Sequence, residues 1–202
     1  MERSSHPSCN LSNDFDKLQT VSGDVPGLEL VNSENWFTLG PGRDRLRNEP
    51  GWLDDFLRRW GFAQARSERE RREALRLRAV LRRVTCAVAA DKPIPAADLA
   101  EFNEFLAARP ARRRLTDIGG AFRVDLDPVR ADWAWILGEI AASVAELLAH
   151  GERARLRLCE NPECRWVFYD RGKNRRRRWC DPTICGNRDK VRRFRARRRA
   201  AG

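Results

Sequence analysis

Apolar residues recur at helical spacing through most of the region 28–150. The clearest case follows Ser67, which forms a capping-box pattern with Glu70. From Ala74 onward, apolar residues return every three or four positions, and Arg or Glu fills many of the positions between them. This pattern predicts a long amphipathic helix. Weaker versions of the same pattern predict three more helices, over residues 49–61, 96–109 and 127–150.

Shorter patterns mark the remaining parts of this region. Residues 26–37 alternate apolar and polar positions, which suits either a short strand or the first turns of a helix. In residues 113–126, alternating apolar residues flank an Ile-Gly-Gly sequence, which predicts a β-hairpin. Residues 1–26 lack periodicity and are rich in Ser, Asn, Asp and Gly, so we expect a disordered leader. The region 28–150 is therefore predicted to be mainly α with a small β-hairpin.

Positive charge is concentrated near the C-terminus. The whole chain has 40 Lys and Arg against 29 Asp and Glu, a net charge of +11. Residues 152–202 hold 18 basic and 6 acidic side chains, a net charge of +12, so residues 1–151 carry −1. This asymmetry indicates a polyanion-binding module attached to a domain of ordinary charge. No apolar stretch approaches the ~20 residues of a membrane helix, and the N-terminus has no apolar signal segment. We therefore expect a cytoplasmic protein with no membrane partner.

Four cysteines lie within the basic region. Cys159 and Cys164 form one C-x4-C pair, and Cys180 and Cys185 form a second pair after a gap of 15 residues. Two short cysteine loops can supply the four sulfur donors of a tetrahedral zinc site, whereas disulfides are disfavoured in the cytosol. A module of about 45 residues also buries too little apolar surface to fold firmly without such support. We predict one structural Zn²⁺ on all four cysteines, with no open position for catalysis.

The residues between the cysteine pairs predict a second hairpin. Residues 166–170 and 175–180 are expected to pair, with a turn between them. Trp166, Phe168 and Trp179 would then cover one side of this hairpin. The resulting order of knuckle, hairpin, second knuckle and helix is that of a treble clef.

A basic helix is expected after Cys185. Gly186 is expected to allow a positive φ, and Asn187 to cap the helix. Val191 and Phe194, three residues apart, are expected to pack on the second hairpin. Another face of the helix would carry Arg188, Arg192, Arg195 and Arg199.

At residues 157–199 the sequence closely resembles the CGNR zinc finger, a family named for the tetrapeptide at 185–188. Both cysteine pairs, the Trp166 and Phe168 positions, the Arg-Trp-Cys run at 178–180 and the arginine-rich helix fit that family. In it the finger follows a domain called ABATE, associated with stress-induced transcription regulation. LELVNSENW (28–36) and the helical region after it are similar to that domain.

The resemblance implies zinc on the four matching cysteines and DNA binding by the basic finger, without catalysis. The predicted organisation is a disordered leader (1–26), an ABATE-like helical domain (28–150) and a CGNR-type zinc finger with a basic C-terminal helix (155–200). The predicted fold class is mainly α with a small β-hairpin, plus a C-terminal treble-clef-like zinc finger.

Together these features predict a zinc-dependent DNA-binding transcriptional regulator, stress-responsive by resemblance and associated with the nucleoid. Basic side chains would neutralise phosphates, and a few from the helix would reach base edges. DNA is favoured over RNA because the aromatic residues of the finger are assigned to its core, which leaves few for stacking on single strands. The expected nucleic-acid contacts are Arg175, Arg176, Arg177, Arg178, Arg188, Lys190, Arg192, Arg193, Arg195 and Arg199.

Other functions compete with this one. Some treble-clef nucleases place catalytic histidines on the hairpin and helix, but this finger has no histidine, so we expect no enzymatic activity. A zinc-stapled adaptor for an acidic protein or RNA also needs fixed positive charge and stays open. The N-terminal domain has no evident DNA role, so we expect it to sense a small-molecule effector or to form a homodimer. The first candidates for effector contacts are Asn32, Asn35 and Trp36.

Overall fold

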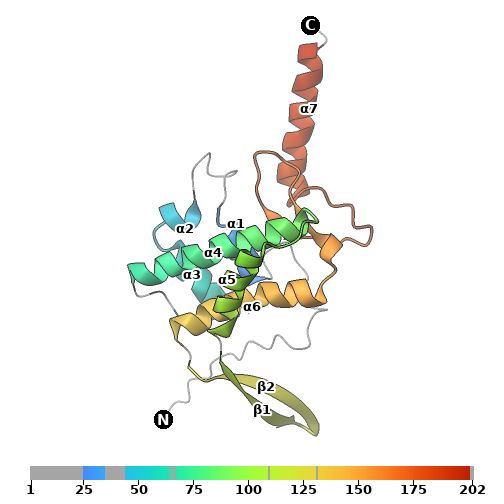
Figure 1. The fold of residues 1–202 in the computed structure, drawn as a ribbon. Helices are drawn as coiled ribbons and strands as arrows, with labels where there is room; N and C mark the ends of the chain where they lie inside the picture. The colour runs from blue at the N-terminus through green and yellow to red at the C-terminus, as the bar shows by residue number, and fades with distance from the viewer. Residues whose placement is uncertain are drawn as a thin grey trace.

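The computed structural model describes residues 25–34, 44–63, 65, 67–108, 110–130 and 132–200. Residues 1–24 of the predicted leader lie outside this set. Helices form the body of the molecule, a two-stranded hairpin projects from one end, and the last helix extends from the other end (Figure 1). The predicted fold class is confirmed. In chain order the α-helices and strands are α1 (Pro26–Asn32), α2 (Arg45–Asn48), α3 (Trp52–Arg59), α4 (Glu68–Ala89), α5 (Ala96–Ala107), β1 (Ala111–Ile118), β2 (Ala121–Pro128), α6 (Trp133–His150), β3 (Leu156–Leu158), β4 (Val167–Tyr169) and α7 (Asn187–Ala200).

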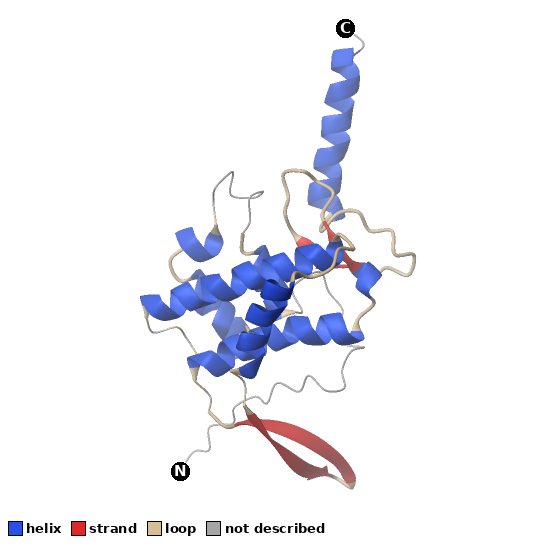
Figure 2. Cartoon of the chain, in the orientation of Figure 1, coloured by secondary structure: helices blue, strands red, loops and turns tan. Residues whose placement is uncertain are grey.

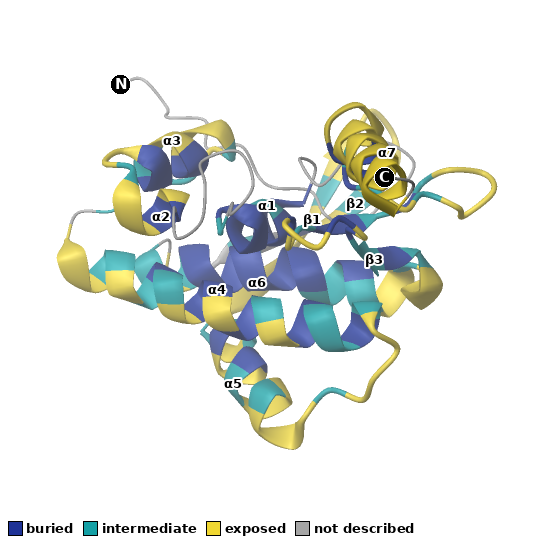
Figure 3. Cartoon of the chain, turned by 90° about the horizontal axis from the view of Figure 1, so that it is seen from above, coloured by how far each residue is buried: buried dark blue, intermediate teal, exposed yellow. Residues whose placement is uncertain are grey.

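The main core lies among α1, α4, α5 and α6. α1 packs against both α4 and α6, and α5 packs across the same two helices. Their buried sides face inward, as Figure 3 shows by colour. Residues 26–37 were compatible with a strand or a helix, and Pro26–Asn32 form the helix α1. Pro26 occupies its first position, where the missing amide hydrogen costs nothing. Leu28, Leu77 and Ile140 from these helices are almost completely buried.

Two helix starts are set by side-chain caps. The Ser67 hydroxyl accepts a hydrogen bond from the amide of Glu70 (3.2 Å), so the predicted start of α4 is confirmed. The start of α6 was predicted at residue 127, which is wrong because the strand pairing of β2 continues to Pro128. α6 begins at Trp133 instead, after Asp132 accepts from the amide of Trp135 (3.1 Å).

The predicted N-terminal hairpin is confirmed as β1 and β2. The strands pair antiparallel from Ala111↔Pro128 to Ile118↔Ala121, and both are eight residues long. Gly119 and Gly120 form the turn with φ of 63° and 90°, a conformation that glycine adopts at little cost. Figure 2 shows the hairpin extending from the helical body.

The second hairpin differs from its prediction. β4 pairs with β3, in the register Leu156↔Tyr169 to Leu158↔Val167, and residues 175–180 form no strand. The buried carboxylate of Asp170 explains the difference, because it accepts from the amides of Gly172 (2.9 Å) and Arg177 (2.9 Å). These two bonds hold the chain after β4 as a loop.

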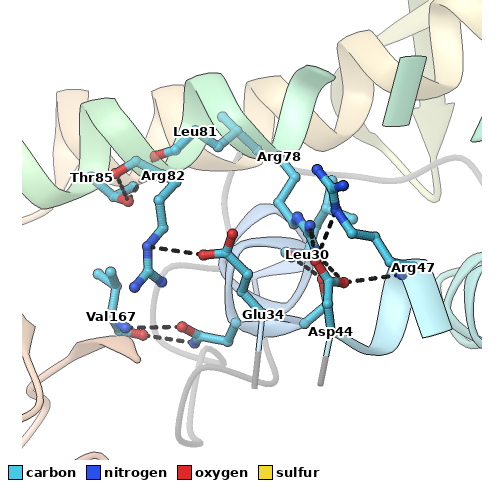
Figure 4. A network of polar contacts seen from close by, with 11 residues as sticks. Leu30, Glu34, Asp44, Arg47, Arg78, Leu81, Arg82, Thr85 and Val167 are labelled. Atoms are coloured by element: carbon cyan, nitrogen blue, oxygen red, sulfur yellow. Dashed lines mark hydrogen bonds and ion pairs between the residues drawn. The ribbon is translucent and has the colours of Figure 1, made fainter. Parts of the chain in front are cut away.

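β4 contributes to two hydrophobic cores. Val167 belongs to the main core together with Leu156, whereas Phe168 packs with the cysteines. Successive side chains of a strand point to opposite faces, so one short strand joins the two cores. Asn32 at the end of α1 strengthens the connection, because its carboxamide donates to the Val167 carbonyl (2.8 Å) and accepts from the Val167 amide (2.9 Å). The helical domain and the finger are therefore packed together through β4 (Figure 4).

Candidate metal centre and basic surface

The first cysteine pair lies on a tight loop between β3 and β4. The amide of Cys159 donates to the carbonyl of Trp166 (2.9 Å), and the amide of Cys164 donates to the carbonyl of Asn161 (2.8 Å). The buried side chain of Asn161 accepts from the amide of Glu163 (3.2 Å). These bonds fold the loop back on itself and bring both sulfurs to one side.

The second cysteine pair lies where the last helical segment begins. The Asp181 carboxylate accepts from the amides of Thr183 (2.7 Å) and Ile184 (3.1 Å), so Asp181 caps this segment. A π-helical turn, η3 (Pro182–Gly186), continues directly into α7. The predicted cap at Asn187 is wrong, because this residue already has helical angles (φ −66°, ψ −41°).

Gly186 lies in a tight space. A Cβ atom at this position would lie only 3.0 Å from Cδ1 of Trp179. The φ of Gly186 is not in the left-handed region, so the predicted positive φ is wrong. Trp179 in turn packs on the cysteine cluster, together with Trp166 and the fully buried Phe168. The close contact therefore joins the start of α7 to the small core of the finger.

The four cysteine sulfurs form one buried cluster. All four Sγ atoms of Cys159, Cys164, Cys180 and Cys185 lie within 4.8 Å of one another. The Cys164–Cys180 and Cys180–Cys185 sulfur distances are both 3.6 Å. A disulfide bond would bring two sulfurs to about 2.05 Å. A tetrahedral zinc site with Zn–S bonds of about 2.3 Å would place them about 3.8 Å apart. The observed spacing fits zinc.

The hydrogen bonds among the thiols shift their pKa values in opposite directions. Hydrogen bonds from Cys164 and Cys180 lower the pKa of Cys159 to about 2. The hydrogen bond with Cys159 raises the pKa of Cys164 to about 12, and a similar contact raises the pKa of Cys180. Several thiolates this close together repel one another unless a cation lies between them, and zinc supplies such a cation.

α7 leaves the metal centre as an exposed basic helix (Figures 1 and 3). It contains eight Arg and Lys residues and one Asp. That Asp189 is buried and forms ion pairs with Arg192 and Arg193, the second at 2.9 Å. Val191 is 48% exposed and Phe194 is 54% exposed, so the prediction that they pack on the hairpin is wrong. The helix projects away from the finger core before these residues can reach it.

The predicted nucleic-acid contacts fall into two groups. Three of those in the loop before Cys180 support the finger itself. Arg175 pairs with Glu152 (2.6 Å), and Arg178 pairs with Glu160 (2.6 Å). The guanidinium of Arg177 donates to the Trp179 carbonyl (2.9 Å) and lies over the ring of Phe168 (5.1 Å to the centroid). Arg175 and Arg178 are nevertheless exposed at the surface, and so are the remaining residues, namely Arg176 in the loop and Arg188, Lys190, Arg192, Arg193, Arg195 and Arg199 on α7.

One face of α7 lines a shallow groove. Asn161 and Glu163 from the first cysteine loop form its other side. No ion pair joins Arg195 or Arg199 to another described residue. The groove brings together the four arginines that were expected to share a face, Arg188, Arg192, Arg195 and Arg199, with Val191 between them.

The candidate effector residues are only partly described. Asn32 is 4% exposed, and both polar groups of its side chain are bonded to Val167. Asn35 and Trp36 lie outside the described residues. The structure thus gives Asn32 a packing role, and effector binding at these residues stays a prediction.

Sequence reasoning missed a buried polar network around Arg78 and Asp44 (Figure 4). Arg78 of α4 donates to Asp44 (2.6 Å) and to the hydroxyl of Ser33 (2.9 Å). Burial alone would raise the pKa of Asp44, but the hydrogen bonds and charge of Arg78 outweigh it and lower the pKa. One signal was present in the sequence, because Arg78 stands four residues after Ala74 on the apolar stripe of the helix.

Comparison with known families matches both parts of the chain. Residues 24–151 match ABATE, described as "Putative stress-induced transcription regulator", and residues 155–198 match the CGNR zinc finger. A search among curated proteins gave no match. In the part of the chain that the structure describes, no helix combines the length and apolar character needed to cross a membrane. The clustered cysteines lie within the zinc-finger match and hold one structural zinc ion. Since the first match spans more than half of the chain, the protein belongs to the ABATE family and carries a C-terminal CGNR zinc finger.

Proposed function

We propose that this protein is a zinc-dependent DNA-binding transcriptional regulator that acts in the stress response. The observation that carries the proposal is α7, an exposed helix with eight basic residues whose start is fixed by the zinc ligands. The family description supports a regulatory role. A cytoplasmic protein of this kind would be associated with the nucleoid.

α7 has the dimensions and chemistry of a recognition helix. Its 14 residues span about 21 Å, and an α-helix fits the major groove of B-DNA, which is about 12 Å wide. Arg195 and Arg199 would neutralise phosphates, while Arg188 and Arg192 lie nearer the zinc centre, in the groove beside Asn161. Zinc contributes orientation, because Cys180 and Cys185 tie the first turn of the helical segment to β4 and Trp179.

Salt dependence of DNA binding tests the proposal. Fluorescence anisotropy with the zinc-loaded full chain and a mixed-sequence duplex should show affinity that falls steeply between 50 and 200 mM salt, roughly 10³–10⁵-fold for 6–10 phosphate contacts. The double variant Arg195→Gln/Arg199→Gln should reduce the slope of log K against log salt by about 2. The matched control Arg58→Gln/Arg69→Gln removes two exposed charges far from α7 and should leave the slope unchanged. Salt-independent binding, or no binding at 50 mM salt, would contradict DNA recognition.

A second candidate is an adaptor that binds an acidic protein or RNA. The exposed Val191 and Phe194 favour it, since apolar side chains beside arginines suit a protein groove. A competition experiment distinguishes DNA binding from the adaptor function. Excess nonspecific duplex DNA should displace an acidic partner if α7 is a DNA-binding helix. The partner should stay bound if α7 is a protein-binding helix.

We also propose that the protein has no catalytic activity. Four thiolate ligands leave zinc no open position for water, and the finger contains no histidine to act as a general base. Incubation of supercoiled plasmid with the zinc-loaded protein and Mg²⁺ should give no nicked product. Nicking that persists through purification would overturn this part of the proposal.

A further inference from the structure

The β1–β2 hairpin has two chemically different faces. In an antiparallel pair, directly opposed residues point to the same face, and the faces alternate along each strand. On one face Arg114 forms two hydrogen bonds with Asp127 (2.6 and 3.0 Å). On the same face Asp125 accepts from the hydroxyl of Thr116 (2.6 Å) and pairs with Arg123 (2.7 Å). Ion pairs therefore occupy most of this face, and the exposed Ile118 (51%) lies at its turn end.

The opposite face of the hairpin is apolar and exposed. Leu115 and Val124 are cross-strand partners, and they are 65% and 51% exposed. Phe122, two residues from Val124, is 72% exposed, more than any other large apolar residue that the structure describes. The hairpin projects from the helical body on the side away from α7 (Figures 1 and 2). An apolar surface of this kind commonly marks an interaction site.

The charges at the two ends of the apolar face are opposite and evenly placed. Arg113 and Asp117 lie two residues before and two residues after Leu115, on the same face, and both are exposed. They are about 14 Å apart along the strand. A two-fold axis through Leu115 exchanges these positions, so Arg113 of one copy would meet Asp117 of the other at both ends. The pattern is thus self-complementary, as an isologous interface requires.

We propose that the β1–β2 hairpin is a homodimerisation arm. Two copies pack antiparallel and face to face through Leu115, Val124 and Phe122, with reciprocal Arg113–Asp117 ion pairs at the ends. A two-stranded face of eight residues measures about 27 Å by 10 Å. This is about a third of the ~800 Å² per partner of a standard interface. The dimer should therefore be reversible, forming at micromolar and separating at nanomolar concentration.

Other occupants fit this face less well. Nucleic acid is disfavoured because the apolar face carries one cation, Arg113, and one anion, Asp117, so it has no excess of positive charge. The hairpin as a whole has four Arg and three Asp, so it offers little net charge to an anionic surface. The Asp117 carboxylate also accepts a hydrogen bond from the amide of Gly120 in the turn (2.8 Å), and a second copy gives both Asp117 and Arg113 a partner of opposite charge.

A charge-exchange experiment tests the proposal. Sedimentation velocity of the zinc-loaded full chain without DNA should show a concentration-dependent dimer for the wild type. Arg113→Asp and Asp117→Arg should each weaken the dimer at least about tenfold, because each creates two repulsive like-charge contacts. An equimolar mixture of the two variants should dimerise again, since both contacts become attractive in the mixed pair.

Two further variants keep the test independent of folding. Leu115→Asp, distant from the turn, should also dissociate the dimer. Arg112→Asp makes the same charge change as Arg113→Asp on the opposite face and should leave the dimer intact. A wild type that stays monomeric, a dimer that survives Leu115→Asp, or a mixture that stays monomeric although both variants give wild-type circular dichroism would overturn the proposal. DNA affinity is measured separately, at nanomolar protein, so failure here would leave the proposed function standing.

Discussion

The two hairpins of this protein have opposite surroundings. β3 and β4 are three residues long, yet Val167 and Phe168 on the two faces of β4 are completely buried. β1 and β2 are eight residues long, yet Leu115 and Phe122 on them are mostly exposed. Burial of both faces, and not strand length, therefore determines how firmly each hairpin is held in this protein.

This difference assigns the hairpins different roles. A two-stranded hairpin alone is marginally stable in water. β3–β4 is supported by zinc and Phe168 on one side and by α1, α4 and Asn32 on the other. It therefore fixes the direction of α7 relative to the helical domain. β1–β2 is held by its Gly-Gly turn and its own ion pairs, which leaves its apolar face exposed.

Removing a zinc ligand should have the largest effect and should break the support of β3–β4. Cys180→Ser leaves three ligands, and zinc binding is worth roughly 10–16 kcal/mol to small zinc modules. Zinc content should fall from one ion per chain toward none, and amide protection in residues 156–186 should be lost while α4 and α6 stay protected. Elemental analysis and hydrogen exchange measure both. Cys86→Ser, in α4 and outside the cluster, is the control and should keep one zinc. Full zinc retention in Cys180→Ser would contradict the assigned ligands.

The next largest loss of stability should come from breaking the buried ion pair between Asp44 and Arg78. Asp44→Ala leaves Arg78 buried without its carboxylate, which should lower the free energy of unfolding by about 3–5 kcal/mol in urea denaturation. Asp55→Ala removes an exposed partner of Arg58 and should cost less than about 1 kcal/mol. Equal losses in the two variants would show that the Asp44–Arg78 pair does not support α1.

Acid should weaken the same pair. The pKa of Asp44 is lowered in the folded protein from its usual value of 3.8. Its contribution to stability is therefore complete above about pH 4 and is lost as the pH falls through the lower folded pKa. The difference in unfolding free energy between wild type and Asp44→Ala should shrink over this interval. Zinc release at acid pH affects both proteins and cancels in the comparison. A difference that stays constant down to pH 2.5 would exclude this linkage.

Asn32→Ala should have an intermediate effect on stability. The substitution leaves the amide and carbonyl of Val167 buried without partners, which should cost about 1–3 kcal/mol. The loss should appear in urea denaturation, and β4 amides should exchange faster while zinc stays bound. Asn103→Ala on the exposed side of α5 is the matched control and should change little. Unchanged exchange at β4 would show that Asn32 does not connect the domain to the finger.

The sequence predicted what local patterns determine. The 3.6-residue rhythm located α4, the Gly-Gly turn located β1–β2, and the two C-x4-C pairs identified all four zinc ligands. Sequence-based prediction failed where a contact between residues far apart in the chain determines the local structure. Residues 175–180 do not pair with β4 because Asp170 holds the chain after β4 as a loop, and Gly186 leaves room for Trp179, which lies against it. Three-residue strands carry too few positions to show a period of two, so tertiary contacts alone could reveal them.

The smallest effect on stability should follow Phe122→Ser. This variant allows a direct comparison between an exposed phenylalanine on β2 and the buried Phe168 on β4. Burial of a phenylalanine is worth roughly 3–5 kcal/mol when the side chain is enclosed, so Phe168→Ala should lose about that much. Phe122 is 72% exposed, and its removal from the monomer should cost less than about 0.5 kcal/mol, as at other surface positions. Urea denaturation at nanomolar protein, followed by tryptophan fluorescence, measures both. A large loss for Phe122→Ser would mean that the hairpin face is covered within its own chain, because only an enclosed ring loses that much on truncation.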